Sequence, residues 1–180
     1  MRKIFFCFLS FLILCTNGCG YTMKSNLPAH VKTIYVTQMK SDIDITSEVA
    51  DSRPERIYRP GIESSTTKSV INRFIFDGNL KLASKKDESD LYLEGTVTDL
   101  VKEPLIYNTD ENIEEYRIKI TAQVFVKNTR DDSTLWEKAS LIGTSTYRTI
   151  GRFHKSEAKA LKEAIDDLAR QIVETTIEGW

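Results

Sequence analysis

Cysteine is scarce in this chain of 180 residues, and its placement limits the chemistry that the chain can carry out. The three cysteines, Cys7, Cys15 and Cys19, all lie within the first 19 residues. Residues 20–180 therefore supply no disulfide, no thiolate metal site and no cysteine nucleophile.

The usual motifs of active sites are also missing. His30 and His154 stand apart from other metal-ligating residues, so neither predicts a metal site. There is no GxSxG motif, and the eight glycines are scattered instead of forming a phosphate-binding loop. Glu114 and Glu115 lie at the start of a predicted strand, where neighbouring side chains point to opposite faces. Asp131 and Asp132 lie in a polar loop, where such pairs are usually solvated. Neither pair therefore predicts acid–base catalysis. We therefore expect no enzymatic activity, no metal and no cofactor.

Neither sign of charge dominates. The chain has 25 basic and 26 acidic residues, and removal of Arg2 and Lys3 with an N-terminal signal leaves 23 against 26, a net charge of −3. Such a balance gives no basic surplus for binding nucleic acid. Beyond the N-terminus, no apolar stretch approaches the roughly 20 residues that cross a bilayer.

The N-terminus has the layout of a secretory signal. Two basic residues, Arg2 and Lys3, precede an apolar run over 4–15 that only Ser10 interrupts. This run of about a dozen residues is too short to span a bilayer. A basic start, a short apolar run and small residues before a break are typical of a cleaved signal peptide. We predict that residues 1–18 are removed.

The residues at the break, Thr16-Asn17-Gly18-Cys19, resemble the lipobox of bacterial lipoproteins, although Thr16 stands where Leu is preferred. We predict that Cys19 carries an N-acyl chain and an S-diacylglycerol, which together anchor a protein stably. The alternatives are a plain thiol behind an ordinary signal peptide and an uncleaved anchor. Gly20 replaces the Asp that favours inner-membrane retention, so we expect the outer membrane.

Apolar periodicity predicts an α+β fold: a four-stranded, mostly antiparallel sheet with two helices packed on one face, in the order β-α-β-β-β-α. We expect residues 19–30 to form a lipidated tether and residues 31–180 to form one domain. Strands are predicted over 31–37, 90–101, 115–126 and 134–147, and helices over 61–76 and from Ser156 onward. The polar segment 38–60 contains two prolines and is predicted to be a long connection.

Three of these patterns specify faces. Over 115–126 the even-numbered residues are apolar and the odd-numbered ones polar, which predicts one wet sheet face. The same reasoning puts Val101 on one face with the odd-numbered residues 91–97. In the first helix the spacing places Ile71 and Ile75 with the apolar side, and in the second it places Ala158 there.

An ordered series of fragments along the chain resembles the LptE family of outer-membrane lipoproteins. The fragments are CGY at 19–21, LP at 27–28, VKTIYV at 31–36, PGIE at 60–63, SDLYLEG at 89–95, Pro104 with Tyr107, and EYRI at 115–118. The resemblance covers nearly all of the chain after Cys19, and the predicted order of elements agrees with that family.

The resemblance implies a non-enzymatic role. LptE proteins plug an LptD-type β-barrel, help it assemble and bind lipopolysaccharide. Basic side chains can pair with the phosphates of such a glycolipid. The candidates are Arg117 and Lys119 on the wet strand face, and Lys127 and Arg130 near the following loop. The alternative for each is an ordinary solvated strand charge.

A second functional hypothesis is a lipid-tethered periplasmic regulator of an envelope enzyme such as a peptidoglycan synthase. Such regulators have a long linker after the lipidated cysteine to span the periplasm. Only about eleven residues separate Cys19 from the first predicted strand. The short spacing favours the barrel partner.

Overall fold

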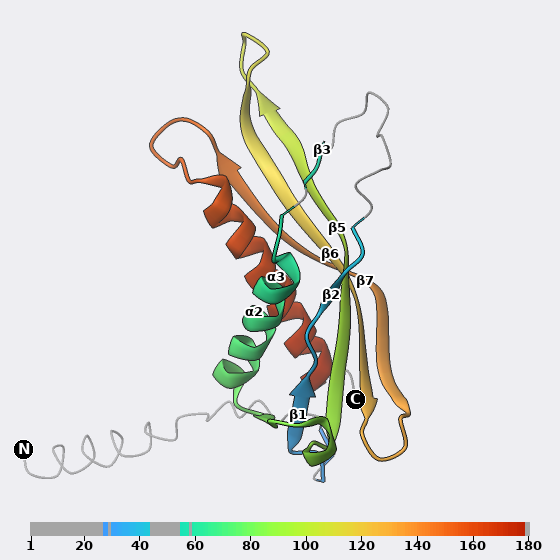
Figure 1. The fold of residues 1–180 in the computed structure, drawn as a ribbon. Helices are drawn as coiled ribbons and strands as arrows, with labels where there is room; N and C mark the ends of the chain where they lie inside the picture. The colour runs from blue at the N-terminus through green and yellow to red at the C-terminus, as the bar shows by residue number, and fades with distance from the viewer. Residues whose placement is uncertain (1–26, 29, 44–54, 58, 179–180) are drawn as a thin grey trace, which may run out of the picture.

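The computed structural model describes residues 27–28, 30–43, 55–57 and 59–178. They build a seven-stranded sheet with two α-helices on one face (Figure 1). The path of the sheet is β4-β1-β5-β6-β7, and β2 and β3 also pair with β5. The strands are β1 (Thr33–Val36), β2 (Lys40–Ser41), β3 (Glu55–Arg56), β4 (Lys81–Leu82), β5 (Leu91–Tyr107), β6 (Ile113–Asn128) and β7 (Thr134–Arg148).

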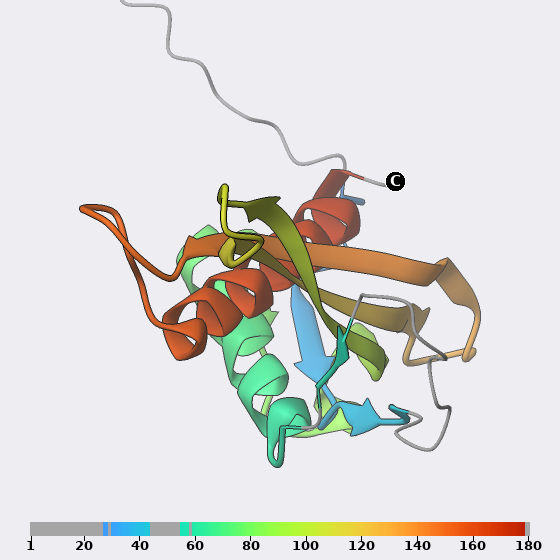
Figure 2. The same ribbon diagram turned by 90° about the horizontal axis from the view of Figure 1, so that it is seen from above.

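The helices are α2 (Ile62–Asp77) and α3 (Glu157–Glu178). Both lie on the same side of the sheet, with α3 along β6 and β7 and α2 beside α3 (Figure 2). The predicted α+β class with two helices on one face is therefore confirmed. The sheet has more strands than the four predicted, because β2, β3 and β4 add two residues each.

Strands β5, β6 and β7 form the predicted antiparallel meander. Strand β1 runs parallel to β5, so the sheet is mixed. Strands β2 and β3 fall inside 38–60, the segment predicted as a connection; β2 continues the path of β1 along β5, and β3 pairs with β5 further on. Residues 44–54 and 58 of that segment, the predicted signal peptide and Cys19 lie outside the described residues.

Local sequence explains where the helices begin and end. The Ser156 hydroxyl accepts a hydrogen bond from the Lys159 amide at 3.2 Å, which confirms the predicted N-cap of α3. Helix α2 ends at Gly78, whose φ of 77° lets its amide donate to the Phe74 carbonyl. Two side chains predicted on the apolar stripes are exposed instead. Ile75 points outward although its neighbour Phe74 is fully buried, and Ala158 lines an open groove between α2 and α3.

A β-bulge changes the face that the second half of β5 presents. The register shifts between Val97 and Asp99, so Leu100 takes the helix-facing position opposite Ile120. The prediction that Val101 shares the face of Val97 is therefore wrong: Val101 lies opposite Lys119, on the other side of the sheet.

The core lies between the helices and the sheet. The even-numbered residues of β6 from 118 to 126 are fully buried there, together with Leu168 and Ile172 of α3. Helix and strand approach closely at Gly143 of β7, where an added Cβ would lie 2.2 Å from the Ala164 carbonyl oxygen. Only glycine fits at this contact.

Candidate functional site: the open face of the sheet

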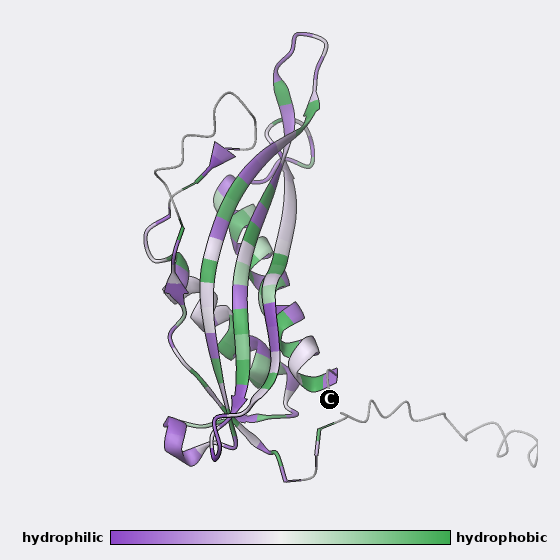
Figure 3. Ribbon diagram, turned by 90° about the vertical axis from the view of Figure 1, so that its right-hand side faces the viewer, coloured by the Kyte–Doolittle hydropathy of each residue, from purple (hydrophilic) through white to green (hydrophobic). Residues whose placement is uncertain are grey.

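The sheet face opposite the helices carries the predicted polar residues. We call it the open face: residues 117, 119, 121, 123, 125 and 127 of β6 with their cross-strand neighbours on β5 and β7. Figure 3 looks onto this face, with the strands in front of the helices. The alternation along β6 is thus confirmed, because its odd-numbered side chains are partly exposed and its even-numbered apolar ones are buried.

Arg117 and Lys119 lie two residues apart on β6 and share one carboxylate. We call them, with Glu103 of β5, the mid-sheet cluster. The Lys119 ammonium is 2.9 Å from one Glu103 oxygen, and the Arg117 guanidinium is 4.0 Å from the other. The longer contact and the 43% exposure of Arg117 leave its donors available to a further anion, whereas Lys119 is held by its partner.

The other two candidates lie at the opposite end of β6. We call Lys86, Tyr92, Glu94, Lys127 and Asp132 the basal cluster. The Lys127 ammonium is 3.3 Å from Glu94, and this hydrogen bond raises the pKa of Lys127 above its ordinary value. The Lys86 ammonium sits 3.4 Å from the centre of the Tyr92 ring. Burial, together with the hydrogen bond from its hydroxyl to Asp132, raises the pKa of Tyr92. The cluster is therefore a packed, ordered group of charges and an aromatic ring.

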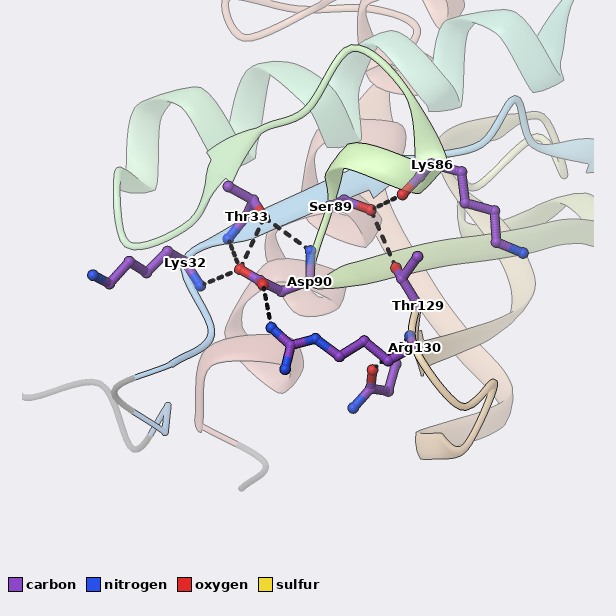
Figure 4. A network of polar contacts seen from close by, with 8 residues as sticks. Lys32, Thr33, Lys86, Ser89, Asp90, Thr129 and Arg130 are labelled. Carbon is purple, nitrogen blue, oxygen red and sulfur yellow. Dashed lines mark hydrogen bonds and ion pairs between the residues drawn. The ribbon is translucent and has the colours of Figure 1, made fainter.

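Arg130 lies beside this cluster, in the loop between β6 and β7. Its guanidinium is 4.0 Å from Asp90 and 76% exposed. Asp90 is held by the Lys32 and Thr33 amides at 2.9 and 3.1 Å and by the Thr33 hydroxyl at 2.9 Å (Figure 4). Chiefly the hydrogen bond from the Lys32 amide keeps the pKa of Asp90 below its ordinary value. Asp90 thus fixes the start of β1 to the start of β5. These hydrogen bonds already stabilise its carboxylate, so the ion pair with Arg130 adds little.

A third cluster lies on the helix side of the sheet, and no pattern in the sequence predicts it. We call Arg59, Lys102, Tyr147 and Glu157 the distal cluster. Glu157 accepts hydrogen bonds from Tyr147 at 3.1 Å, from Lys102 at 3.5 Å and from Arg59. Burial by itself raises the pKa of Glu157, but Lys102, Tyr147 and Arg59 outweigh it and hold that pKa below the ordinary value. Burial and the Glu157 carboxylate raise the pKa of Tyr147 well above its ordinary range.

This cluster joins the segment before α2 to the first turn of α3. The Tyr147 ring also stacks on Tyr116, with centroids 5.5 Å apart, and Lys102 lies 5.1 Å from the centre of the Tyr116 ring. All its members have partners within the cluster, so its role is to fasten elements together. The single sequence signal was an acidic residue in the first turn of a helix, which is common wherever the helix dipole is positive.

The structure brings the four candidate cations together in two places. Arg117 and Lys119 meet at the mid-sheet cluster, and Lys127 and Arg130 lie at the basal end. Lys119 and Lys127 are eight residues apart along β6, about 26 Å at the usual rise per residue. Each cation has a carboxylate within 4.0 Å. One compact group such as a single phosphate cannot touch both clusters, although an extended molecule can.

Within residues 27–28, 30–43, 55–57 and 59–178, no three His, Cys, Asp or Glu side chains gather as a metal site would require. Over the same residues, neither helix has the length and apolar character needed to cross a bilayer.

The chain was compared with protein families, with curated proteins and with solved structures. A family model described as LptE, lipopolysaccharide-assembly, matches residues 32–176. Among solved structures, a point variant of PelC from Paraburkholderia phytofirmans, a dodecamer, is 14% identical over 86% of this chain and 95% of its own, with a TM-score of 0.48. A minor lipoprotein from Acinetobacter baumannii is 14% identical over 82% and 92%, with a TM-score of 0.45. Rare lipoprotein B from Shewanella oneidensis is 13% identical over 78% and 93%, with a TM-score of 0.43. No curated protein matches the sequence.

Proposed function

Because the chain belongs to the LptE lipopolysaccharide-assembly family, we propose that it is a lipid-anchored partner and plug of an LptD-type outer-membrane β-barrel. The match over residues 32–176 confirms the resemblance carried by the sequence fragments. The protein then acts by binding, with no reaction of its own. Its lipid is the acylated Cys19, and its place is the periplasmic side of the outer membrane.

The open face is the observation that carries this proposal. The lumen of an outer-membrane barrel is polar, so a plug must present a polar surface to it. The charges on the open face pair across strands, Lys119 with Glu103 and Lys127 with Glu94; next to that face on the same side of β6, Arg148 pairs with Glu115 at 3.0 Å. Such a surface is hydrophilic and carries little net charge. It can therefore lie against a wall of mixed charges without leaving a large buried charge uncompensated.

The same face offers contacts for the phosphates of lipopolysaccharide. Arg117 and Arg130 are the most available of the four candidate cations, because each is 4.0 Å from its carboxylate. A guanidinium can bind a phosphate in bidentate fashion while it keeps a loose carboxylate neighbour. Lys119 and Lys127 are bound more closely and contribute mainly charge. We propose Arg117 and Arg130 as first contacts, with Lys119 and Lys127 beside them.

The tethered regulator of an envelope enzyme remains the alternative function. It requires a surface that reaches a partner across the periplasm, and the short spacing between Cys19 and β1 works against that reach. The family assignment and the extended polar face both favour the barrel partner.

Affinity purification from detergent-solubilised envelopes tests the proposal. We expect the tagged protein to recover a large β-barrel of the LptD type in stoichiometric amount. As a control, the same tag is placed on an unrelated outer-membrane lipoprotein. Barrels recovered with both proteins are then recognised as non-specific. Recovery of a peptidoglycan synthase without any barrel would overturn the proposal and support the regulator.

A further inference from the structure

Two large apolar side chains stand exposed next to each other at the end of α2. Phe76 is 81% exposed and Ile75 is 64% exposed, although both belong to a helix whose other apolar residues pack inward. Asp77 is the last residue of the helix, Gly78 caps it, and Leu80, which is 2% exposed, returns the chain to the core. The helix therefore carries Ile75 and Phe76 past the edge of the core and leaves them in solvent.

A cationic side chain lies against this apolar pair. The Arg73 guanidinium lies 5.4 Å from the centre of the Phe76 ring. Lys81 follows three residues after Gly78, and its amide donates to the Lys32 carbonyl at 2.9 Å; both lysine side chains are exposed and add positive charge to this end of the molecule. An apolar tip beside a cationic side chain can bind at a phospholipid interface, because the apolar groups enter the acyl boundary and the cation reaches the phosphates.

The position of this tip relative to the predicted lipid anchor indicates that the surface it binds is the membrane. The end of α2 and the start of β1 lie at the same end of the molecule, the lower end in Figure 1. Eight residues join Cys19 to Leu27, a span of at most about 29 Å for an extended chain. The opposite end, with the β5–β6 hairpin and the loop after β7, lies about 50 Å away along β5. Only the end that holds Ile75 and Phe76 stays within reach of the anchoring leaflet whichever way the molecule stands.

We propose that Ile75 and Phe76, with Arg73 beside them, form a docking surface for the phospholipid headgroups of the leaflet that holds the lipid anchor. This proposal rests on the lipidation of Cys19 contained in the proposed function. Docking would hold the lower end of the molecule on the membrane before the barrel takes it up.

Site-specific labelling tests the docking surface directly. Residues 20–180 contain no cysteine, so Phe76→Cys in the lipidated protein provides a single thiol for an environment-sensitive dye. Phe153→Cys is the matched control, because Phe153 is 77% exposed and lies in the loop at the opposite end. Both positions are exposed, so neither substitution removes core packing.

The labelled proteins are anchored in vesicles of phosphatidylethanolamine and phosphatidylglycerol. We expect the dye at position 76 to shift to the blue and to be quenched severalfold more by spin-labelled lipid than the dye at position 153. Equal quenching at the two positions, or a water-like spectrum at position 76, would overturn the docking surface. Because these vesicles contain no barrel, a negative result leaves the barrel recovery unaffected, and the two proposals fail separately.

Discussion

The two faces of β6 are built on the same strand but are held by different forces. On the helix side, Ile118, Ile120, Ala122, Val124 and Val126 are all fully buried against α3 and its neighbours. On the open face, the odd-numbered residues are partly exposed, and its charged ones pair with carboxylates on β5. The first face is held by the close packing of apolar side chains and the second by ion pairs between strands. Substitutions on the first should therefore alter stability, and substitutions on the second should alter binding.

The largest effect is expected on the helix-facing side. Ile120→Ala should lower the free energy of unfolding by about 3–4 kcal/mol, because it removes a fully buried side chain and leaves a cavity. Thr121→Ala, one residue along on the open face, should change it by less than about 0.5 kcal/mol. Urea titrations of the two variants measure the contrast. Equal losses would show that the two faces are not held differently.

Gly143→Ala probes the close contact between α3 and the sheet. The new Cβ would lie 2.2 Å from the Ala164 carbonyl oxygen and 2.6 Å from the Leu168 Cβ, so the helix must move away from β7. We expect a loss of about 2–3 kcal/mol in the free energy of unfolding, typical of overpacking. Thermal unfolding followed by circular dichroism is the measurement. An unchanged melting temperature would contradict the tight contact.

Glu157→Gln tests the distal cluster through its pH dependence. Hydrogen bonds to a charged partner are lost, so we expect a loss of about 1–2 kcal/mol at neutral pH. The pKa of Glu157 is lower in the folded state than its ordinary 4.5, so its stabilisation is complete above that value. This stabilisation disappears as the pH falls through the folded-state pKa. Unfolding titrations should accordingly give a difference between variant and parent that shrinks in acid. A difference that stays constant with pH would rule out the ion-paired carboxylate as its source.

The smallest effect on stability, and the clearest on binding, is expected at the mid-sheet cluster. Replacement of Arg117 and Lys119 by Gln removes two partly exposed charges and should change stability by less than about 1 kcal/mol. Binding of lipopolysaccharide, measured with the purified variant, should weaken. Lys162→Gln on the outer side of α3 is the control, since its side chain is 76% exposed and far from the open face. Unchanged binding in the double variant would remove Arg117 and Lys119 from the contact set.

The sequence allowed the long elements to be predicted because each repeats its pattern many times. β6 alternates without interruption over 115–126, which fixes both its type and its two faces. The two-residue strands β2, β3 and β4 are too short to show any period, so they could not be found. The bulge after Val97 could not be predicted either, since it depends on the register with β6.

The predicted end of β5 is wrong. The strand was predicted to stop at Val101, yet it continues through Pro104 to Tyr107. The register shifts just after Pro104, and β3 pairs with β5 only as far as Lys102, so the missing amide of proline interrupts no second ladder. Such tolerance is a property of the sheet edge and is not encoded in the neighbouring residues.

For the candidate site, the sequence identified the face but not the partners. Alternation placed Arg117 and Lys119 on the wet side, and the structure agrees. Their shared partner Glu103 lies 14 and 16 residues earlier on another strand, and only the register of β5 with β6 brings it near. The distal cluster is less predictable still, because Arg59, Lys102 and Glu157 come from three separate segments.

Photo-crosslinking from the open face tests the central claim most directly. A photoreactive residue placed at Thr121 lies in the middle of that face, and one placed at Lys162 lies on the outer side of α3. In intact cells, we expect position 121 to crosslink to a large outer-membrane β-barrel more strongly than position 162. Crosslinks to the barrel from position 162 alone, or to no barrel from either position, would contradict the assignment of the open face as the barrel-facing surface.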